Sequence, residues 1–346
     1  MPAPVVPAPV VPASSDPDGP QLLRDITFVV NRSIKGKEAV IEFALLAMVA
    51  RGHVLIEDAP GVGKSTLARA LADALGGRFS RIQFTSDLLP ADLIGSSVWR
   101  SHAETFEFRP GPLFANVVLA DEINRAPPRT QSALLEAMSD QQVSVEGITY
   151  PLPQPFTVLA TQNPQEHYGT YPLPESQRDR FTMRIEMGYA SADVEASLLR
   201  NLRAPARAPA APMAAPTAAP TAETSGIQIA RDPAPTEALQ LAQVAADQVT
   251  VHADLAHYAQ RVVSQTRALP GIRLGVSTRG ALAWMASARA RAYLHGRHHV
   301  DVDDLQALAV ATLAHRLLSD HETGTENTQL CADLVRDVIA STAVPV

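Results

Sequence analysis

The chain contains little cysteine and no long apolar segment. Its 346 residues include one cysteine, Cys331, so no disulfide can form within the chain, and a lone thiol fits a reducing compartment. The longest apolar candidate, residues 39–50, is shorter than the roughly 18 residues of a membrane-spanning helix and carries Glu42. Residues 1–20 are rich in proline and have no basic start, which argues against a secretory signal. We therefore expect a cytoplasmic protein without a membrane span.

Positive charge is also scarce. The formal net charge is −7 and the isoelectric point is near 5.8, which disfavours a dedicated nucleic-acid binder. Lysine occurs only at Lys35, Lys37 and Lys64, and arginine supplies the other basic side chains. A lysine retained in such a chain indicates a need for a compact point charge rather than a planar guanidinium.

One lysine belongs to a glycine-rich loop between a predicted strand and a predicted helix. Residues 58–65 read Asp-Ala-Pro-Gly-Val-Gly-Lys-Ser, after the apolar residues 53–56 and before the helix-prone residues 66–75. In such a loop, glycines let backbone N–H groups face phosphate oxygens, and the helix N-terminus and Lys64 add positive charge. The Ser65 hydroxyl can ligate Mg²⁺. A plain glycine-rich turn that ends a strand is the alternative.

Two other apolar runs end in polar side chains. Residues 117–120 lead into Asp121 and Glu122, and residues 156–160 lead towards Asn163. Parallel strands end at one sheet edge, where ligands bind, so we expect Asp121 to hold Mg²⁺ and Glu122 to polarise the attacking water. Asn163 would orient this water or contact the γ-phosphate, although acids and asparagine at strand ends are also common as caps and turns. The expected nucleotide-binding residues are Pro60, Gly61, Val62, Gly63, Lys64, Ser65, Thr66 and Asp121, with Ser65 and Asp121 also as Mg²⁺ ligands.

An arginine precedes the last apolar strand of this part of the chain. Arg180 lies in the run Arg-Asp-Arg-Phe at residues 178–181. From this position it can reach a nucleotide bound by a neighbouring subunit and stabilise charge on the transferred phosphoryl group. Pairing with Asp179 as an ordinary surface arginine is the alternative, and Arg178 could share the role.

Apolar periodicity predicts an α/β fold with a parallel sheet flanked by helices, followed by a helical domain. The predicted boundaries are a Pro/Ala tail at residues 1–20, the α/β core at 21–203, a Pro/Ala linker at 204–235 and the helical domain at 236–346. Predicted strands are 54–56, 81–84, 117–120, 156–160 and 183–187, and predicted helices are 38–49, 65–75, 130–139, 191–202, 236–249, 253–266, 278–295, 302–319 and 328–341. Two hairpins are predicted, 97–100 with 105–109 and 142–145 with 148–152. We expect Arg289, Arg291 and Arg297 to lie on a solvated helix face.

Long blocks of the sequence resemble the MoxR family of AAA+ ATPases. They comprise residues 108–114, 119–138, 160–181 and 274–280, and the resemblance covers about residues 22–319 apart from the linker. It implies a P-loop AAA+ core and a helical lid that assemble as a ring, usually a hexamer, and bind ATP with Mg²⁺. It also implies the following roles: Lys64 and Ser65 in Walker A, Asp121 and Glu122 in Walker B, Asn163 as sensor 1, Arg180 as arginine finger and Arg279 as sensor 2.

The resemblance further implies a chaperone that acts on a protein client together with a von Willebrand A-domain protein. The chain departs from the family pattern at Asp58, where glycine is usual, at Lys37, where glutamine is common, and at Thr278, where proline is usual. Three other functions stay open: the ATPase subunit of a metal chelatase, a nucleic-acid motor, and a nucleotide-gated scaffold with little turnover.

Overall fold

The structure is a computed structural model that describes residues 18–59, 61–101, 104–163, 169–200, 235–320 and 325–345. Of the predicted site residues, Pro60 lies outside the described residues. The predicted tail up to residue 17 and the predicted linker up to residue 234 also lie outside them.

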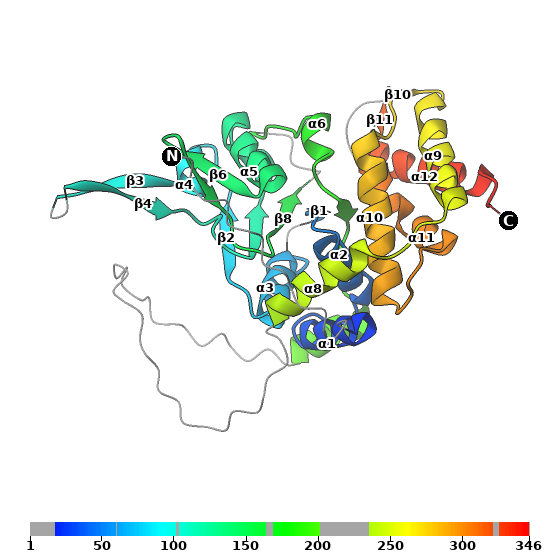
Figure 1. Cartoon of the computed structure of the whole chain (residues 1–346), viewed down its shortest axis with the longest axis horizontal. Helices are drawn as coiled ribbons and strands as arrows, with labels where there is room; N and C mark the ends of the chain where they lie inside the picture. Colours follow the sequence, from blue (N-terminus) through cyan, green and yellow to red (C-terminus); the bar gives the residue numbers. More distant parts are fainter. Residues whose placement is uncertain are drawn as a thin grey trace, which may run out of the picture.

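Within the described part of the chain, five parallel strands form the central sheet (Figure 1). Their order across the sheet is β2-β5-β8-β1-β9, with bounds β1 Val54–Glu57, β2 Phe79–Gln83, β5 Val117–Asp121, β8 Thr157–Gln162 and β9 Met183–Ile185. All five start within two residues of the predicted positions. Strands of a parallel sheet are buried on both faces, which is why they read as continuous apolar runs.

Alternate strand residues pack into two separate apolar clusters. One cluster joins Val54, Val117 and Leu159 to helices α2 (Glu38–Val49) and α3 (Lys64–Ala74). The other cluster covers the opposite face of the sheet, where side chains such as Leu55 and Val118 meet helices α4 (Pro90–Ile94) and α5 (Pro128–Asp140). The sheet is therefore the middle layer of an α/β/α core, and its strand ends stay open for a site.

Two hairpins project from the core. Strands β3 (Gly95–Arg100) and β4 (Thr105–Pro110) form a ribbon that extends well away from the body of the molecule (Figure 1), and β6 (Gln142–Val145) pairs with β7 (Ile148–Pro151). Trp99 and Phe106 pack edge to face on the first ribbon with centroids 5.1 Å apart, and they are 50% and 67% exposed. Phe108 instead stacks on Tyr150 of the second hairpin at 4.0 Å.

The C-terminal helices form the lid, which packs against α2 and β9 of the core. The remaining elements are α7 Ala192–Arg200, α8 Pro235–Asp247, α9 Ala253–Ala268, α10 Thr278–Leu294, α11 Val302–Leu313 and α12 Thr325–Ser341, with short helices α6 Glu175–Arg178, η1 Ile123–Arg125 and η2 Ala314–Arg316. Helix α10 starts at the predicted Thr278, capped by Ser277, whose side chain accepts a hydrogen bond from Gly280 N. None of the described helices is both long enough and apolar enough to cross a bilayer.

The structure differs from the sequence-based prediction at several places. Helix α1 (Gly19–Asn31) was not predicted, and it begins inside the range assigned to the tail. The predicted helix 302–319 ends at Leu313, and its last residues form η2 and β11 (Leu318–Ser319), which pairs with β10 (Ile272–Leu274). The lid is thus not purely helical.

Two lid arginines, Arg291 and Arg297, do not lie on the solvated helix face that was predicted for them. Arg291 Nη1 lies 2.6 Å from Asp304 Oδ1, and Arg297 binds both carboxylate oxygens of Asp304, whose side chain is fully buried. These charge-assisted hydrogen bonds hold the pKa of Asp304 below its usual value even though burial acts to raise it. The two arginines are therefore half-buried and anchored on an interior carboxylate.

Candidate functional site: a phosphate-binding loop at the carboxyl edge of the sheet

The glycine-rich loop has the backbone conformation that its sequence predicts. Gly61 and Gly63 have φ angles of +86° and +98°, values that residues other than glycine seldom adopt. Gly63 is the N-cap of α3, which begins at Lys64, so the free N–H groups of the helix start face the loop. Lys64 Nζ donates to the carbonyl oxygen of Asp58 at 2.7 Å. Partial burial lowers the pKa of Lys64, although the negative charges of nearby carboxylates act to raise it.

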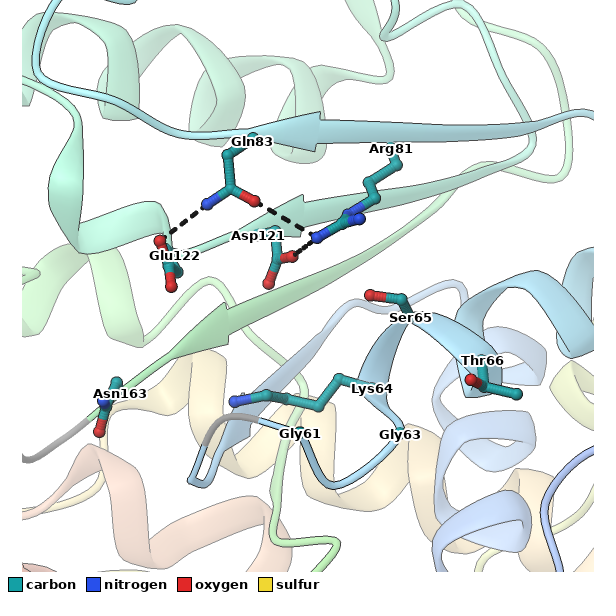
Figure 2. A pocket seen from close by; sticks show the side chains of 10 residues that line it. All are labelled: Gly61, Gly63, Lys64, Ser65, Thr66, Arg81, Gln83, Asp121, Glu122 and Asn163. Atoms are coloured by element: carbon teal, nitrogen blue, oxygen red, sulfur yellow. Dashed lines mark hydrogen bonds and ion pairs between the residues drawn. The ribbon is translucent and has the colours of Figure 1, made fainter. Parts of the chain in front are cut away.

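The loop faces a cavity of about 370 Å³ at the carboxyl edge of the sheet (Figure 2). Eight predicted site residues line this cavity together: Gly61, Gly63, Lys64, Ser65, Thr66, Asp121, Glu122 and Asn163. They come from three different segments: the β1–α3 loop with the first turn of α3, the end of β5 and the end of β8. The predicted loop residue Val62 packs its side chain against the core instead.

The two acidic residues at the end of β5 are held in place by neighbouring strands. Asp121 Oδ2 accepts a hydrogen bond from Arg81 at 2.6 Å, and Asp121 Oδ1 accepts one from the Thr161 hydroxyl at 2.6 Å. Glu122 Oε2 accepts from Gln83 Nε2 at 2.7 Å, and Glu122 N donates to Thr161 Oγ1 at 2.9 Å. Glu122 also has a φ of +58°, a strained conformation for a non-glycine residue that turns the chain away from the sheet.

Arg81, Gln83 and Thr161 were not predicted as site residues. Arg81 and Gln83 are two positions apart on β2, so their side chains lie on the same face of the sheet. The register of β2 against β5 places Gln83 opposite Asp121. In the sequence, the polar residues Arg81 and Gln83 on either side of the buried Ile82 indicate that both side chains face away from the core. Only the strand order shows that these two side chains reach Asp121 and Glu122.

Asp58, the departure from the usual glycine, ties the loop to the chain after β9. Its carboxylate accepts hydrogen bonds from Ala59 N at 2.7 Å and from Gly188 N. Lys37 holds the same segment, because its Nζ donates to three successive carbonyls, those of residues 187–189. Where a glycine would leave the loop backbone free to move, the Asp58 carboxylate ties the loop to Gly188.

Arg180 and Arg279 lie away from this cavity. Both line a second, smaller cavity of about 210 Å³, together with residues that include Arg51, His53 and Ser139. Arg180 Nη1 donates to Leu135 O at 2.8 Å and to the Ser139 hydroxyl. The two predicted nucleotide-sensing arginines are therefore together, although one comes from the core and the other from the lid.

The two cavities lie at opposite edges of the sheet. Strand β1 begins at Val54, which pairs with Met183 of β9, so Arg180 precedes the amino end of β9. Asp121, in contrast, is the last residue of β5. The four residues of β1 span roughly 13 Å at 3.3 Å per residue. With its guanidinium bonded to helix α5, Arg180 is directed away from the loop of its own subunit.

Arg178 has different surroundings from Arg180. Its positive charge acts on Glu57, a carboxylate whose pKa burial raises above the usual value, while the charges of Arg184 and Arg178 oppose this rise. Arg184 Nη1 lies 3.1 Å from Glu57 Oε2. Among the described residues, the second cavity is lined by Arg180 and not by Arg178, so this geometry does not support a shared role.

Comparisons with known proteins match both parts of the chain. A family model described as "ATPase family associated with various cellular activities (AAA)" matches residues 53–183, and a model described as "AAA lid domain" matches residues 264–334. A solved protein from Cytophaga hutchinsonii, assigned as an ATPase, superimposes with a TM-score of 0.77 at 30% identity, over 95% of this chain and 96% of that chain. The predicted AAA+ core with a following lid is thereby confirmed.

Full-length relatives share much of the sequence as well. The uncharacterized protein YeaC of Bacillus subtilis (strain 168) is 44% identical over 92% of this chain and 93% of its own length. Chaperone MoxR1 of Mycobacterium tuberculosis is 40% identical over 85% of this chain and 75% of its own length. The similarity therefore extends across core and lid.

Proposed function

Because the chain belongs to the MoxR family of AAA+ ATPases, we propose that it is a ring-forming chaperone ATPase whose active sites are shared between neighbouring subunits. One observation carries this proposal. The phosphate-binding loop and the two acids lie at one edge of the sheet, while Arg180 and Arg279 lie together at the other edge. One subunit therefore presents two incomplete halves of a hydrolytic site.

The residues of the larger cavity fit a nucleoside triphosphate with Mg²⁺. Two glycines, a lysine and a helix N-terminus converge on a space that a polyphosphate can fill. The Ser65 hydroxyl and the Asp121 carboxylate supply hard oxygen ligands of the kind that Mg²⁺ prefers. When held by these two side chains, Mg²⁺ would neutralise part of the charge of the phosphates.

The protein side chains divide the work of hydrolysis. Lys64 exchanges its hydrogen bond to the Asp58 carbonyl for contacts with phosphate oxygens. The Glu122 carboxylate accepts a hydrogen bond from the attacking water and thereby polarises it. Asn163, which lines the same cavity, orients this water or contacts the γ-phosphate. Thr161 keeps the two acids in fixed relation, because it bonds to the Asp121 carboxylate and to the Glu122 backbone.

Arg180 and Arg279 complete the site of the adjacent subunit. Both guanidinium groups can approach a neighbour's γ-phosphate from the amino edge of the sheet, where their charge stabilises the transferred phosphoryl group. An arginine in this role is worth about 10³–10⁵ in rate. Arg279 is included because it lines the same cavity as Arg180 and not the cavity of Lys64.

The remodelling role is supported by less direct observations. A relative at 40% identity is named a chaperone. The β3–β4 ribbon carries the exposed pair Trp99 and Phe106 away from the body of the core, a suitable position to contact a protein client (Figure 1). We propose a von Willebrand A-domain protein as the adaptor and a hexamer as the assembly.

Subunit mixing tests the shared site. Arg180→Ala should retain ATP binding and lose hydrolysis, while Lys64→Ala should lose binding but keep its arginines. Mixed rings pair the intact pocket of the first variant with the intact arginines of the second, so steady-state turnover should partly return. No recovery at any mixing ratio would refute a site completed by the neighbour.

A partner assay separates the proposed function from its rivals. Steady-state ATP turnover is measured for the protein alone, with a von Willebrand A-domain protein, and with duplex DNA at several salt concentrations. Stimulation by the protein partner supports the chaperone. Stimulation by DNA with a steep salt dependence would favour a nucleic-acid motor instead, and negligible turnover under every condition would favour a scaffold.

A further inference from the structure

The segment that carries Arg180 is held by a buried arginine of the lid. Arg316, whose side chain is 2% exposed, donates from Nη1 to the backbone oxygen of Asp179 at 2.8 Å and to its carboxylate. Arg316 Nη2 donates to Phe181 O at 2.6 Å, and Nε donates to Thr312 O at 2.8 Å. The guanidinium therefore binds the residue before Arg180 and the residue after it.

The helix that carries Arg279 meets the same carboxylate. Ser277 Oγ lies 3.1 Å from each carboxylate oxygen of Asp179 and also caps the start of α10. Arg279 is in the first turn of this helix. Gly280 packs directly on Arg316, since a Cβ at this glycine would lie 2.8 Å from Arg316 Cδ. Asp179 thus connects the two segments whose arginines line the smaller cavity.

Burying this guanidinium costs free energy, and four hydrogen bonds offset the cost. A buried guanidinium is costly unless its N–H groups find acceptors, and here three carbonyls and one carboxylate accept from it. Burial lowers the pKa of Arg316, and the charge and hydrogen bond of Asp179 oppose this effect. Apolar packing alone can hold two domains together, whereas hydrogen bonds from a planar guanidinium to the carbonyls of Asp179 and Phe181 also fix a direction.

We propose that Arg316 is a positioning residue that acts through Asp179 to set the relative placement of Arg180 and Arg279. The proposal rests on the shared active site proposed above. Arg316 itself touches no nucleotide. It makes the pair of arginines a single unit, so that a movement of the lid moves both groups that face the neighbour's phosphates.

A complementation experiment separates this role from simple lid stability. Arg316→Met removes the donors while keeping an unbranched side chain that replaces the aliphatic part of arginine. We expect ATP affinity, measured with a fluorescent ATP analogue, to stay unchanged, and turnover to fall about 100-fold, the loss expected when a catalytic group is displaced by about 1 Å. Mixing with Lys64→Ala should restore turnover, because those subunits contribute correctly placed arginines. Mixing with Arg180→Ala should not restore turnover, because every subunit of the mixed ring then either lacks Arg180 or holds it out of place.

A matched control is available in the same domain. Arg297→Met also removes a lid arginine from an aspartate, Asp304, but this pair does not contact residues 179–181. It should lower the melting temperature without the selective rescue pattern. If Arg316→Met does not give folded rings, Asp179→Asn keeps the side-chain shape, weakens the same contact and should show the same selective rescue.

Three outcomes overturn the proposal: turnover near the wild-type value in folded rings of both variants, rescue by Arg180→Ala subunits, or no rescue by Lys64→Ala subunits. The last result is interpreted against the reference mixture of Arg180→Ala with Lys64→Ala. If the reference recovers and Arg316→Met does not, only the positioning role is wrong. If the reference also fails, the shared active site is wrong and the positioning role falls with it.

Discussion

The buried His53 predicts a specific loss of stability in mild acid. This side chain is 3% exposed, with Nδ1 accepting from Val158 N at 3.0 Å and Nε2 lying 3.0 Å from Met138 O. These partners require the neutral ring with its proton on Nε2. Burial lowers the pKa of His53 from 6.5 to about 4, although the Met138 carbonyl acts in the opposite direction.

The sign and size of the effect follow from the two pKa values. Above pH 6.5 the histidine is neutral in both the folded and the unfolded chain, and its full contribution to stability is present. Below pH 6.5 the unfolded chain takes up a proton that the folded chain refuses, so stability falls until the pH nears 4. The shift of about 2.5 pH units corresponds to about 3 kcal/mol in total, of which about 2 kcal/mol is lost between pH 7 and pH 5.

Urea unfolding at pH 7 and at pH 5 measures this loss. His53→Gln lacks the titrating group, so its free energy of unfolding should fall by about 2 kcal/mol less than that of the wild type over the same interval. His315, whose pKa is also lowered by burial, titrates in both proteins and cancels in the comparison. Equal losses for the two proteins would refute the neutral, doubly hydrogen-bonded state of His53.

Three further predictions concern the site and its support. Glu122→Gln should bind ATP normally and hydrolyse it about 10²–10⁴-fold more slowly, as measured by nucleotide binding and steady-state turnover. Arg81→Met removes an internal cation that competes for Asp121, so the Mg²⁺ concentration for half-maximal ATP binding should fall about two- to fivefold, and a rise would contradict this. Gly52→Ala places a Cβ 1.9 Å from Thr182 Oγ1 and should destabilise the core by about 1–3 kcal/mol in thermal unfolding, with partial recovery on adding Thr182→Gly.

The core and half of its site were predictable because their signals are local. A buried parallel strand reads as an apolar run, and a phosphate loop needs glycine where φ is positive, as at Gly61 and Gly63. Helix α1 also had local signals that were overlooked. Asp18 caps it, proline follows in the first turn, and Ile26 and Val30 are spaced for a buried face.

The other features depend on contacts that only the folded chain brings together. Arg291 and Arg297 suit a solvated helix face until Asp304 is placed beside them, and Arg81 matters only because β2 lies next to β5. Strands β10 and β11 are too short to give a periodic signal. The placement of Arg279 depends on how the lid docks, which residue spacing does not encode.

The short strand β9 joins the two halves of the site within one subunit. Before its first residue, Met183, the chain passes through the Arg180 segment that the lid residue Arg316 holds. After its last residue, Ile185, the chain reaches Gly188, whose N–H donates to the Asp58 carboxylate in the phosphate-binding loop. All three residues of β9 pair with β1, which ties both ends of this short strand to the central sheet. A displacement of the loop would therefore either break the Asp58 contact or be passed along β9 to the segment that carries Arg180, and a glycine at position 58 would lack this contact.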